Sequence, residues 1–171
     1  MSNPIAPLTG KLAARSVRYL IIGVSGANLY GPAGQAVFAT EDFDLFLPPD
    51  PVNLLEAWAA CEDAGLELSV VGEPLDRPRD LWLAERIVQR RVLTRASGGQ
   101  DLLVDLTLTM TGYDFETVWR ERRSFIIEDI ETPVARLLHI VTSKHATGRD
   151  KDRLFLAAHR DALEQLLKRE P

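Results

Sequence analysis

The sequence has a single cysteine and no long hydrophobic run, and these absences exclude several classes of protein. Cys61 is the one cysteine among 171 residues, so an internal disulfide is excluded. No stretch approaches the roughly 18 consecutive apolar residues that a membrane-spanning helix needs. The opening segment MSNPIAPLTG lacks the basic start and apolar centre of a signal peptide. We therefore expect a cytoplasmic protein with no membrane partner.

An excess of positive charge is also missing. The chain has 20 lysines and arginines against 25 acidic residues, which gives a net charge of −5. Such a chain has no overall basic field to attract nucleic acid or an anionic membrane. Its length is that of one domain with a substantial core. We predict a single domain over residues 1–171, with a core at about 17–130 and a helical C-terminal lobe at about 133–170.

The order of the predicted elements indicates the fold class. Strand patterns are expected at 18–22, 44–47, 66–71, 88–94, 101–110 and 124–130. Helical patterns are expected at 26–30, ended by Gly31-Pro32-Ala33-Gly34, and from Pro51 to Gly65. From Pro133 to Glu170 the pattern is helical, with an interruption at Gly148. This order predicts an α+β fold, with a mixed β-sheet, helices on one side and a C-terminal helical segment.

Two aspartates stand at the start of a buried strand, in the segment ATEDFDLFL at 39–47. Alternate residues of a strand point to the same face, so Asp42 and Asp44 are expected side by side. Two carboxylates this close repel each other, and a divalent cation relieves that repulsion. Solvation of both aspartates at a loop edge is the other interpretation of this pair.

A third acid lies within the strongest strand pattern of the chain. In DLLVDLTLTM at 101–110, Asp105 shares its face with Leu103 and Thr107, while leucines and a valine occupy the other face. A mid-strand aspartate is costly to bury unless it is paired, hydrogen-bonded or bound to a metal. If this strand lies beside the strand of Asp42 and Asp44, three carboxylates converge, as a two-metal phosphoryl-transfer site requires. An edge strand with a wet face is the alternative for Asp105.

A glycine-containing turn follows the first predicted strand, in RYLIIGVSGANLYG. Backbone N–H groups at such a turn can hold phosphate, and Ser25 adds a hydroxyl. A dinucleotide-binding site is a competing interpretation, because an acid follows 19 residues after Gly23. Two features count against it. The helix after the turn is too short, and the acids open their strand instead of closing it.

These segments together resemble the nucleotidyltransferase fold of the DNA polymerase β superfamily. The resemblance is carried by GVSGANLYG at 23–31, ATEDFDLFL at 39–47 and the strand acid Asp105. More closely, the sequence is similar to small prokaryotic members related to AbiEii-type toxins and to the minimal nucleotidyltransferases. The segment LLHIVTSKHATGRDKDRLFL at 137–156 resembles the C-terminal helix of that family, in which a lysine precedes an R-x-K-D segment.

The resemblance implies an enzyme that moves an NMP group from an NTP donor to an acceptor hydroxyl. Asp42, Asp44 and Asp105 are then the catalytic residues and the ligands of two Mg²⁺ ions, for which Mn²⁺ could substitute. Asp105 is also the base toward the acceptor. The residues expected to contact the triphosphate are Gly23, Ser25, Lys144, Arg149 and Lys151. Protein, RNA and small molecules all remain candidate acceptors.

The sequence also departs from the family pattern. Val24 stands where the family has a second glycine, so the phosphate turn is altered. A catalytically inactive protein of the same fold, acting as a binding or toxin–antitoxin-type regulatory module, is therefore the alternative function. Most of the arginines in the middle of the chain are expected to be solvated among acids, although a nucleotide or RNA contact is open to them: Arg77, Arg79, Arg86, Arg90, Arg91 and Arg95.

Overall fold

The computed structural model of the chain describes residues 3–32, 36–99 and 101–170. Its helices are α1 (Ala6–Ala14), α2 (Gly23–Asn28), α3 (Pro51–Asp63), α4 (Leu81–Arg90), α5 (Phe115–Arg120), α6 (Leu137–Thr147), α7 (Asp150–Ala158) and α8 (Arg160–Arg169). Its strands are β1 (Leu20–Ile22), β2 (Phe43–Phe46), β3 (Glu67–Val70), β4 (Glu73–Pro74), β5 (Thr94–Gly98), β6 (Leu102–Thr107), β7 (Arg123–Ile127) and β8 (Ile130–Val134).

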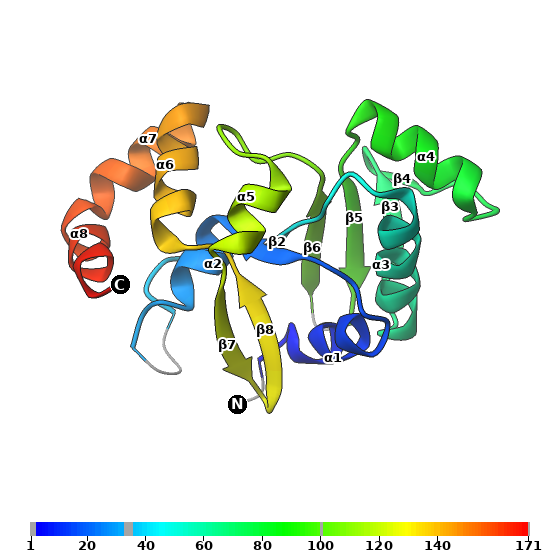
Figure 1. The fold of residues 1–171 in the computed structure, drawn as a ribbon, viewed down its shortest axis with the longest axis horizontal. Helices are drawn as coiled ribbons and strands as arrows, with labels where there is room; N and C mark the ends of the chain where they lie inside the picture. Colours follow the sequence, from blue (N-terminus) through cyan, green and yellow to red (C-terminus); the bar gives the residue numbers. More distant parts are fainter. Residues whose placement is uncertain (1–2, 33–35, 100, 171) are drawn as a thin grey trace.

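The strands form one mixed sheet in the order β4-β3-β5-β6-β2-β1-β8-β7. Two of the pairings are parallel, β2 with β6 and β1 with β8, and the other pairings are antiparallel. The C-terminal helices α7 and α8 lie at one end of the molecule, while β3, β4 and α4 lie at the other (Figure 1). The acid-bearing strands β2 and β6 are therefore central in the sheet and adjacent to each other.

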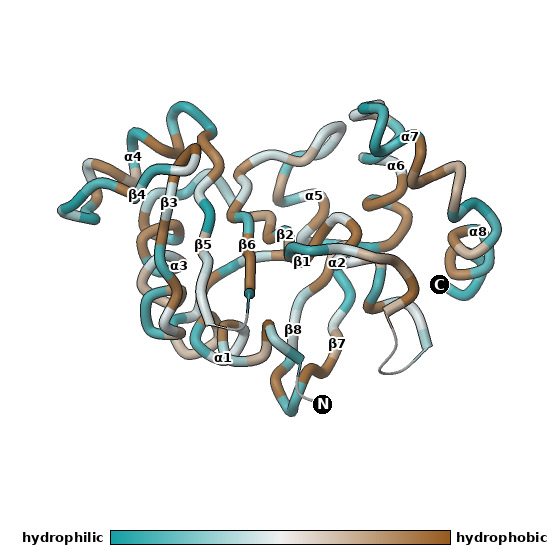
Figure 2. Tube along the Cα trace, turned by 180° about the vertical axis from the view of Figure 1, so that it is seen from behind, coloured by the Kyte–Doolittle hydropathy of each residue, from teal (hydrophilic) through white to brown (hydrophobic). Residues whose placement is uncertain are grey.

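Two hydrophobic clusters cover the two faces of the sheet. Within β1, Ile21 belongs to the larger cluster, while Leu20 and Ile22 belong to the other. Since successive residues of a strand face opposite sides, the clusters lie on opposite faces. The larger cluster packs α1, α3 and α4 against the sheet, and the smaller one packs α2, α5, α6 and α8. Figure 2 shows the central strand β6 as largely hydrophobic and the edge strand β4 as hydrophilic.

Several helix ends follow from local chemistry. The Asp50 side chain accepts hydrogen bonds from the N–H groups of Val52 and Asn53 at the start of α3. Asp80 and Asp114 cap α4 and α5 in the same way. Aspartate is favoured there because it satisfies N–H groups that have no partner within the helix. Gly148 ends α6 in the left-handed conformation, with φ +63°.

The predicted α+β class, mixed sheet and C-terminal helical segment are confirmed. Beyond the single helical layer that we expected, the structure has helices on the second face as well. The predicted strand at 88–94 is wrong, because α4 continues to Arg90 and β5 begins at Thr94. The strand expected at 124–130 is a hairpin of β7 and β8. Part of the helix-ending segment at 31–34 lies outside the described residues.

Among the described helices, none combines the length and hydrophobicity that crossing a membrane would require.

Candidate active site

Three neighbouring strands place charged side chains in a row on one face of the sheet. Asp44 of β2 is aligned with Asp105 of β6, and Asp105 is aligned with Arg95 of β5. The residues on either side of Asp44 and Asp105 point into the larger hydrophobic cluster, so these acids face the opposite side, toward α2 and α6. Alternation along each strand and register between strands together bring distant parts of the chain to one place.

Asp42, Asp44 and Asp105 each offer a carboxylate oxygen, and these oxygens lie within 4.8 Å of one another. We call these three residues the acid site. Convergence of the three acids required the two acid-bearing strands to be adjacent, and β2 pairs with β6. The alternative of a wet edge strand fails for Asp105, since β6 lies between β5 and β2 and Asp105 is 7% exposed. Oxygen ligands in such a group are those that Mg²⁺ and Mn²⁺ prefer.

Asp44 is largely buried beside the two other acids of this site. Burial raises the pKa of Asp44 to about 6, and the negative charges of Asp42 and Asp105 contribute to the rise. The positive charges of Lys144 and Lys151 act in the opposite direction on the same pKa. A cation bound among the three carboxylates would remove the repulsion that raises this pKa. The donor set therefore fits a divalent metal.

Gly23 makes room for the Asp44 carboxylate. It has φ +65°, and a Cβ atom at this position would lie 2.5 Å from Oδ2 of Asp44. A side chain would thus be strained by the backbone and would also collide with a member of the acid site. The predicted contact of Gly23 with phosphate stays a prediction, and the structure gives this glycine a packing role that the sequence did not indicate.

Ser25 is buried and connects the glycine turn to β2. Its hydroxyl donates to the carbonyl of Ile22 at 2.9 Å and accepts from the N–H of Asp44 at 3.1 Å. The serine therefore helps to fix the backbone of an acid-site residue. Its predicted contact with phosphate stays a prediction. Gly26 is required by packing, because a Cβ there would lie 2.9 Å from the carbonyl oxygen of Ile21.

The predicted basic residues come from α6 and α7, and two of them converge on a buried aspartate. Asp152 is 1% exposed and receives Lys144 Nζ at 3.3 Å and Arg149 Nε at 2.7 Å. We call Lys144, Arg149 and Asp152 the Asp152 cluster. Burial would raise the pKa of Asp152, but the hydrogen bond from Arg149 and the charge of Lys144 outweigh it and lower this pKa. Lys151 is exposed and lies outside this cluster.

Arg95, one of the arginines of which most were expected to be solvated among acids, contacts the acid site instead, a role that the sequence interpretation missed. Its Nε and a terminal nitrogen donate to the two oxygens of Asp105 at 2.7 and 3.0 Å. A terminal nitrogen also lies 3.7 Å from Asp42. A strand predicted to end at residue 94 left Arg95 in a loop. The sequence shows only a charged residue between Thr94 and Ala96, and the structure shows that both of these neighbours are buried.

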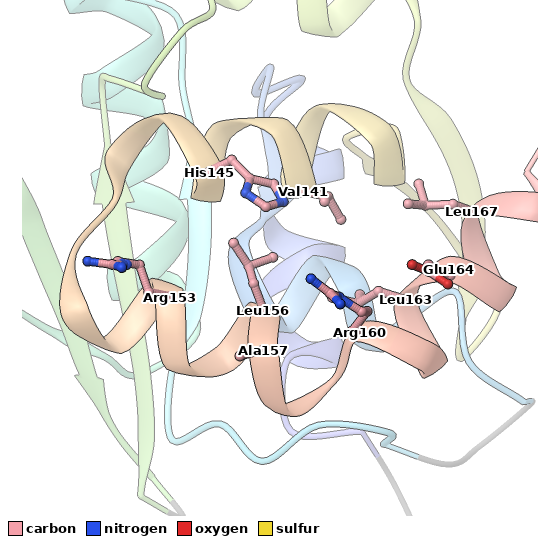
Figure 3. A pocket seen from close by; sticks show the side chains of 9 residues that line it. All are labelled: Val141, His145, Arg153, Leu156, Ala157, Arg160, Leu163, Glu164 and Leu167. Carbon is pink, nitrogen blue, oxygen red and sulfur yellow. The ribbon is translucent and has the colours of Figure 1, made fainter.

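A separate pocket of about 420 Å³ lies among the C-terminal helices (Figure 3). Its lining combines apolar side chains, including Leu156 and Leu163, with Arg153 and Arg160, and it contains none of the predicted site residues. The pocket is therefore distinct from the acid site in the residues that form it.

No protein-family model and no curated protein matches the sequence of this chain. Its structure is similar to that of ANT(2")-Ia, a nucleotidyltransferase solved in complex with adenylyl-2"-tobramycin. This similarity has a TM-score of 0.54 and 16% sequence identity, and it covers 96% of this chain and 92% of ANT(2")-Ia. A nucleotidyltransferase-like protein from Paracoccidioides brasiliensis matches with a TM-score of 0.48 and 16% identity over 95% of this chain and 71% of its own. The first comparison establishes that the chain has the nucleotidyltransferase fold.

Proposed function

We propose that this protein is a Mg²⁺-dependent nucleotidyltransferase, which transfers an NMP group from an NTP to an acceptor hydroxyl. The observation that carries the proposal is the convergence of Asp42, Asp44 and Asp105 on adjacent strands of this fold. The same fold in ANT(2")-Ia, which was solved with an adenylyl-bearing compound, supports nucleotidyl transfer as the kind of reaction.

In this proposal the acid site holds the metal. Bound Mg²⁺, or Mn²⁺ in its place, would neutralise phosphate charge and activate the attacking oxygen, with two ions expected in the active complex. Burial and the negative charges of Asp42 and Asp105 raise the pKa of Asp44, and a bound cation would offset that negative charge, which supports its role as a metal ligand. Asp105 is proposed to accept the proton of the acceptor hydroxyl at a carboxylate oxygen.

The basic residues of α6 and α7 are proposed to bind the triphosphate. Two cations, Lys144 and Arg149, share one carboxylate in the Asp152 cluster, so positive charge is left over there. Lys144 and Lys151 lie close enough to Asp44 for their charges to lower its pKa. Positive charge at this distance from a metal site suits the phosphates of a metal-bound nucleotide. Gly23 and Ser25 are proposed as further phosphate contacts.

The acceptor and the subfamily are finer proposals. A protein, an RNA or a small molecule could each supply the hydroxyl. ANT(2")-Ia supports a small molecule, because its complex contains tobramycin that carries an adenylyl group. We retain the small prokaryotic AbiEii-related proteins as the proposed subfamily, with a cytoplasmic location and a possible place in a toxin–antitoxin pair.

One observation favours a second candidate function, a binding or regulatory module without catalysis. The guanidinium of Arg95 donates to both oxygens of Asp105. A metal ion bound to Asp105 would have to share these oxygens with Arg95. If Arg95 stays bound to Asp105 at all times, the protein keeps the fold but does not bind the metal and the NTP donor. The two functions differ in a measurable property, which is the binding of a nucleotide in the presence of Mg²⁺.

A calorimetric titration with a non-hydrolysable NTP and Mg²⁺ tests the proposal. We expect binding to the wild-type protein that disappears without Mg²⁺ and weakens at least about 100-fold in Asp42→Asn, because a metal ligand is lost. Glu41→Gln is the matched control, since Glu41 is exposed in the same segment, and it should bind as the wild type does. Absence of metal-dependent binding for every NTP in the wild-type protein contradicts the proposal and supports the regulatory module.

A further inference from the structure

The guanidinium of Arg95 lies where the acid site most needs positive charge. Its two donors meet the two oxygens of Asp105 at 2.7 and 3.0 Å, and a third contact reaches Asp42 at 3.7 Å. Arg95 is the cation in direct contact with the acid site among the described residues. The guanidinium contacts two of the three carboxylates, so the acid site as a whole keeps a net negative charge.

The two partners of this ion pair differ in their freedom to move. The Asp105 side chain is 10% exposed and is held within a central strand, whereas the Arg95 side chain is 43% exposed. A long side chain that is partly in water can rotate away without disturbing the sheet, because its strand backbone stays paired. A buried carboxylate cannot follow it. Any cation that binds Asp105 therefore competes with Arg95 for the negative charge of its two oxygens.

We propose that Arg95 is a positioning residue that stands in for the metal, an inference that rests on the proposed function. In the cation-free state it holds the Asp105 carboxylate and attracts Asp42, so that the acids remain together despite their repulsion. A divalent cation displaces it from at least one oxygen of Asp105. Arg95 therefore lowers the affinity of the acid site for a metal that arrives alone.

This role differs from that of an ordinary cross-strand ion pair. An ordinary cross-strand ion pair stabilises the sheet. Removing it is not expected to increase the affinity of the protein for a metal ion. Removing a residue that competes with the metal should increase the metal affinity, because the three carboxylates are then left without a cation. The effect should follow the geometry of the side chain as well as its charge. Lysine keeps the charge but presents a point contact in place of a two-pronged one.

The test is a titration with Mn²⁺ alone, without nucleotide, followed by the loss of the free Mn²⁺ signal in electron paramagnetic resonance. We expect Arg95→Gln to bind Mn²⁺ about ten-fold more tightly than the wild type, or tighter still, because a nearby positive charge is removed. Arg95→Lys should be intermediate. Arg90→Gln removes an exposed arginine of α4 and should leave the affinity unchanged. Asp44→Asn combined with Arg95→Gln should abolish the gain.

The outcomes separate this inference from the proposed function. If the wild type binds Mn²⁺ and Arg95→Gln binds it equally or more weakly, the role of Arg95 is overturned while the metal site stands. If neither protein binds Mn²⁺, both the inference and the metal site are overturned. A thermal melt checks that each variant is folded, and if Arg95→Gln is unfolded, the comparison of Arg95→Lys with the wild type decides.

Discussion

The acid site and the Asp152 cluster have opposite imbalances of charge. In the acid site three carboxylates lie near a single guanidinium, that of Arg95, which contacts Asp42 and Asp105, whereas in the Asp152 cluster one carboxylate is shared by two cations. Burial is the largest influence on the pKa of Asp44 and of Asp152, and in both it acts to raise the pKa. The neighbours decide the outcome: the pKa of Asp44 rises to about 6, while that of Asp152 falls below its ordinary value.

The difference indicates what kind of ligand suits this part of the molecule. The acid site lacks positive charge, and the Asp152 cluster has it in excess. The charge of Lys144, in the Asp152 cluster, lowers the pKa of Asp44 in the acid site. A ligand that carries a cation beside phosphate groups complements both regions at once. The three predictions that follow alter one region at a time, from the largest expected effect to the smallest.

Removing the shared carboxylate of the Asp152 cluster should have the largest effect on stability. Asp152→Ala leaves Lys144, whose side chain is 14% exposed, without its partner. Loss of one member of a buried ion pair leaves an uncompensated charge, and we expect the free energy of unfolding to fall by about 2–3 kcal/mol. Urea unfolding measures this change. Asp150→Ala, an exposed change in the same turn of α7, should cost less than about 1 kcal/mol, and equal losses in the two variants contradict the prediction.

Crowding the acid site should have the next largest effect. Gly23→Ala introduces a Cβ that would lie 2.5 Å from Asp44 Oδ2, at a backbone angle of φ +65°. We expect a loss of about 2 kcal/mol in unfolding free energy, of which about 1 kcal/mol is backbone strain, and a loss of Mg²⁺-dependent nucleotide binding.

The control for this change is Gly99→Ala. Gly99 has a similar φ of +61°, but no atom lies within 4 Å of the position of its Cβ. Gly99→Ala should lose only the unfolding free energy that comes from backbone strain, and it should still bind nucleotide. If the two variants bind nucleotide equally well, the close approach of Gly23 to Asp44 has no importance for the site.

The smallest effect concerns pH in the absence of metal. Because the folded pKa of Asp44 is raised to about 6, its contribution to stability is present below the unfolded pKa and is lost as the pH rises through about 6. Between pH 4 and pH 7 we expect wild-type stability to fall by about 1–2 kcal/mol relative to Asp44→Asn, which lacks this titration. Urea unfolding across this range measures the difference.

Two further measurements sharpen this prediction. Lys151 lowers the pKa of Asp44, so Lys151→Gln should move the wild-type transition to higher pH. Saturating Mg²⁺ should remove the loss of stability above pH 6, since metal binding requires the deprotonated carboxylate. A pH profile that is the same in the wild type and in Asp44→Asn contradicts the assignment.

The acid site could be predicted from the sequence because local patterns determine it. Alternation placed Asp105 opposite a fully apolar face, and the spacing of Asp42 and Asp44 placed both on one side of a strand. Register between β2 and β6 then followed from burying the apolar face of each strand. The same reasoning indicated the mixed sheet and the helical C-terminal segment.

Other features were missed for physical reasons. The chain leaves α4 at Arg91, a non-glycine residue in the left-handed conformation, so no conventional stop signal marked the end of that helix. The strand that carries Arg95 was consequently placed too early. The bonds of Ser25 to Ile22 and Asp44 depend on how α2 sits against β1 and β2, which no local pattern reveals.

The parallel pairing of β2 with β6 also affects the order in which the chain folds. Residues 47–101 lie between these strands and form α3, α4 and three strands that must be arranged before the pairing can close. Contacts between residues this far apart in the chain form slowly, because a long loop must be ordered first. Asp105 therefore joins Asp44 only after this segment has been arranged, and a nascent chain that has not yet reached β6 contains Asp42 and Asp44 without the third carboxylate. The acid site is thus complete only when β2 and β6 have paired.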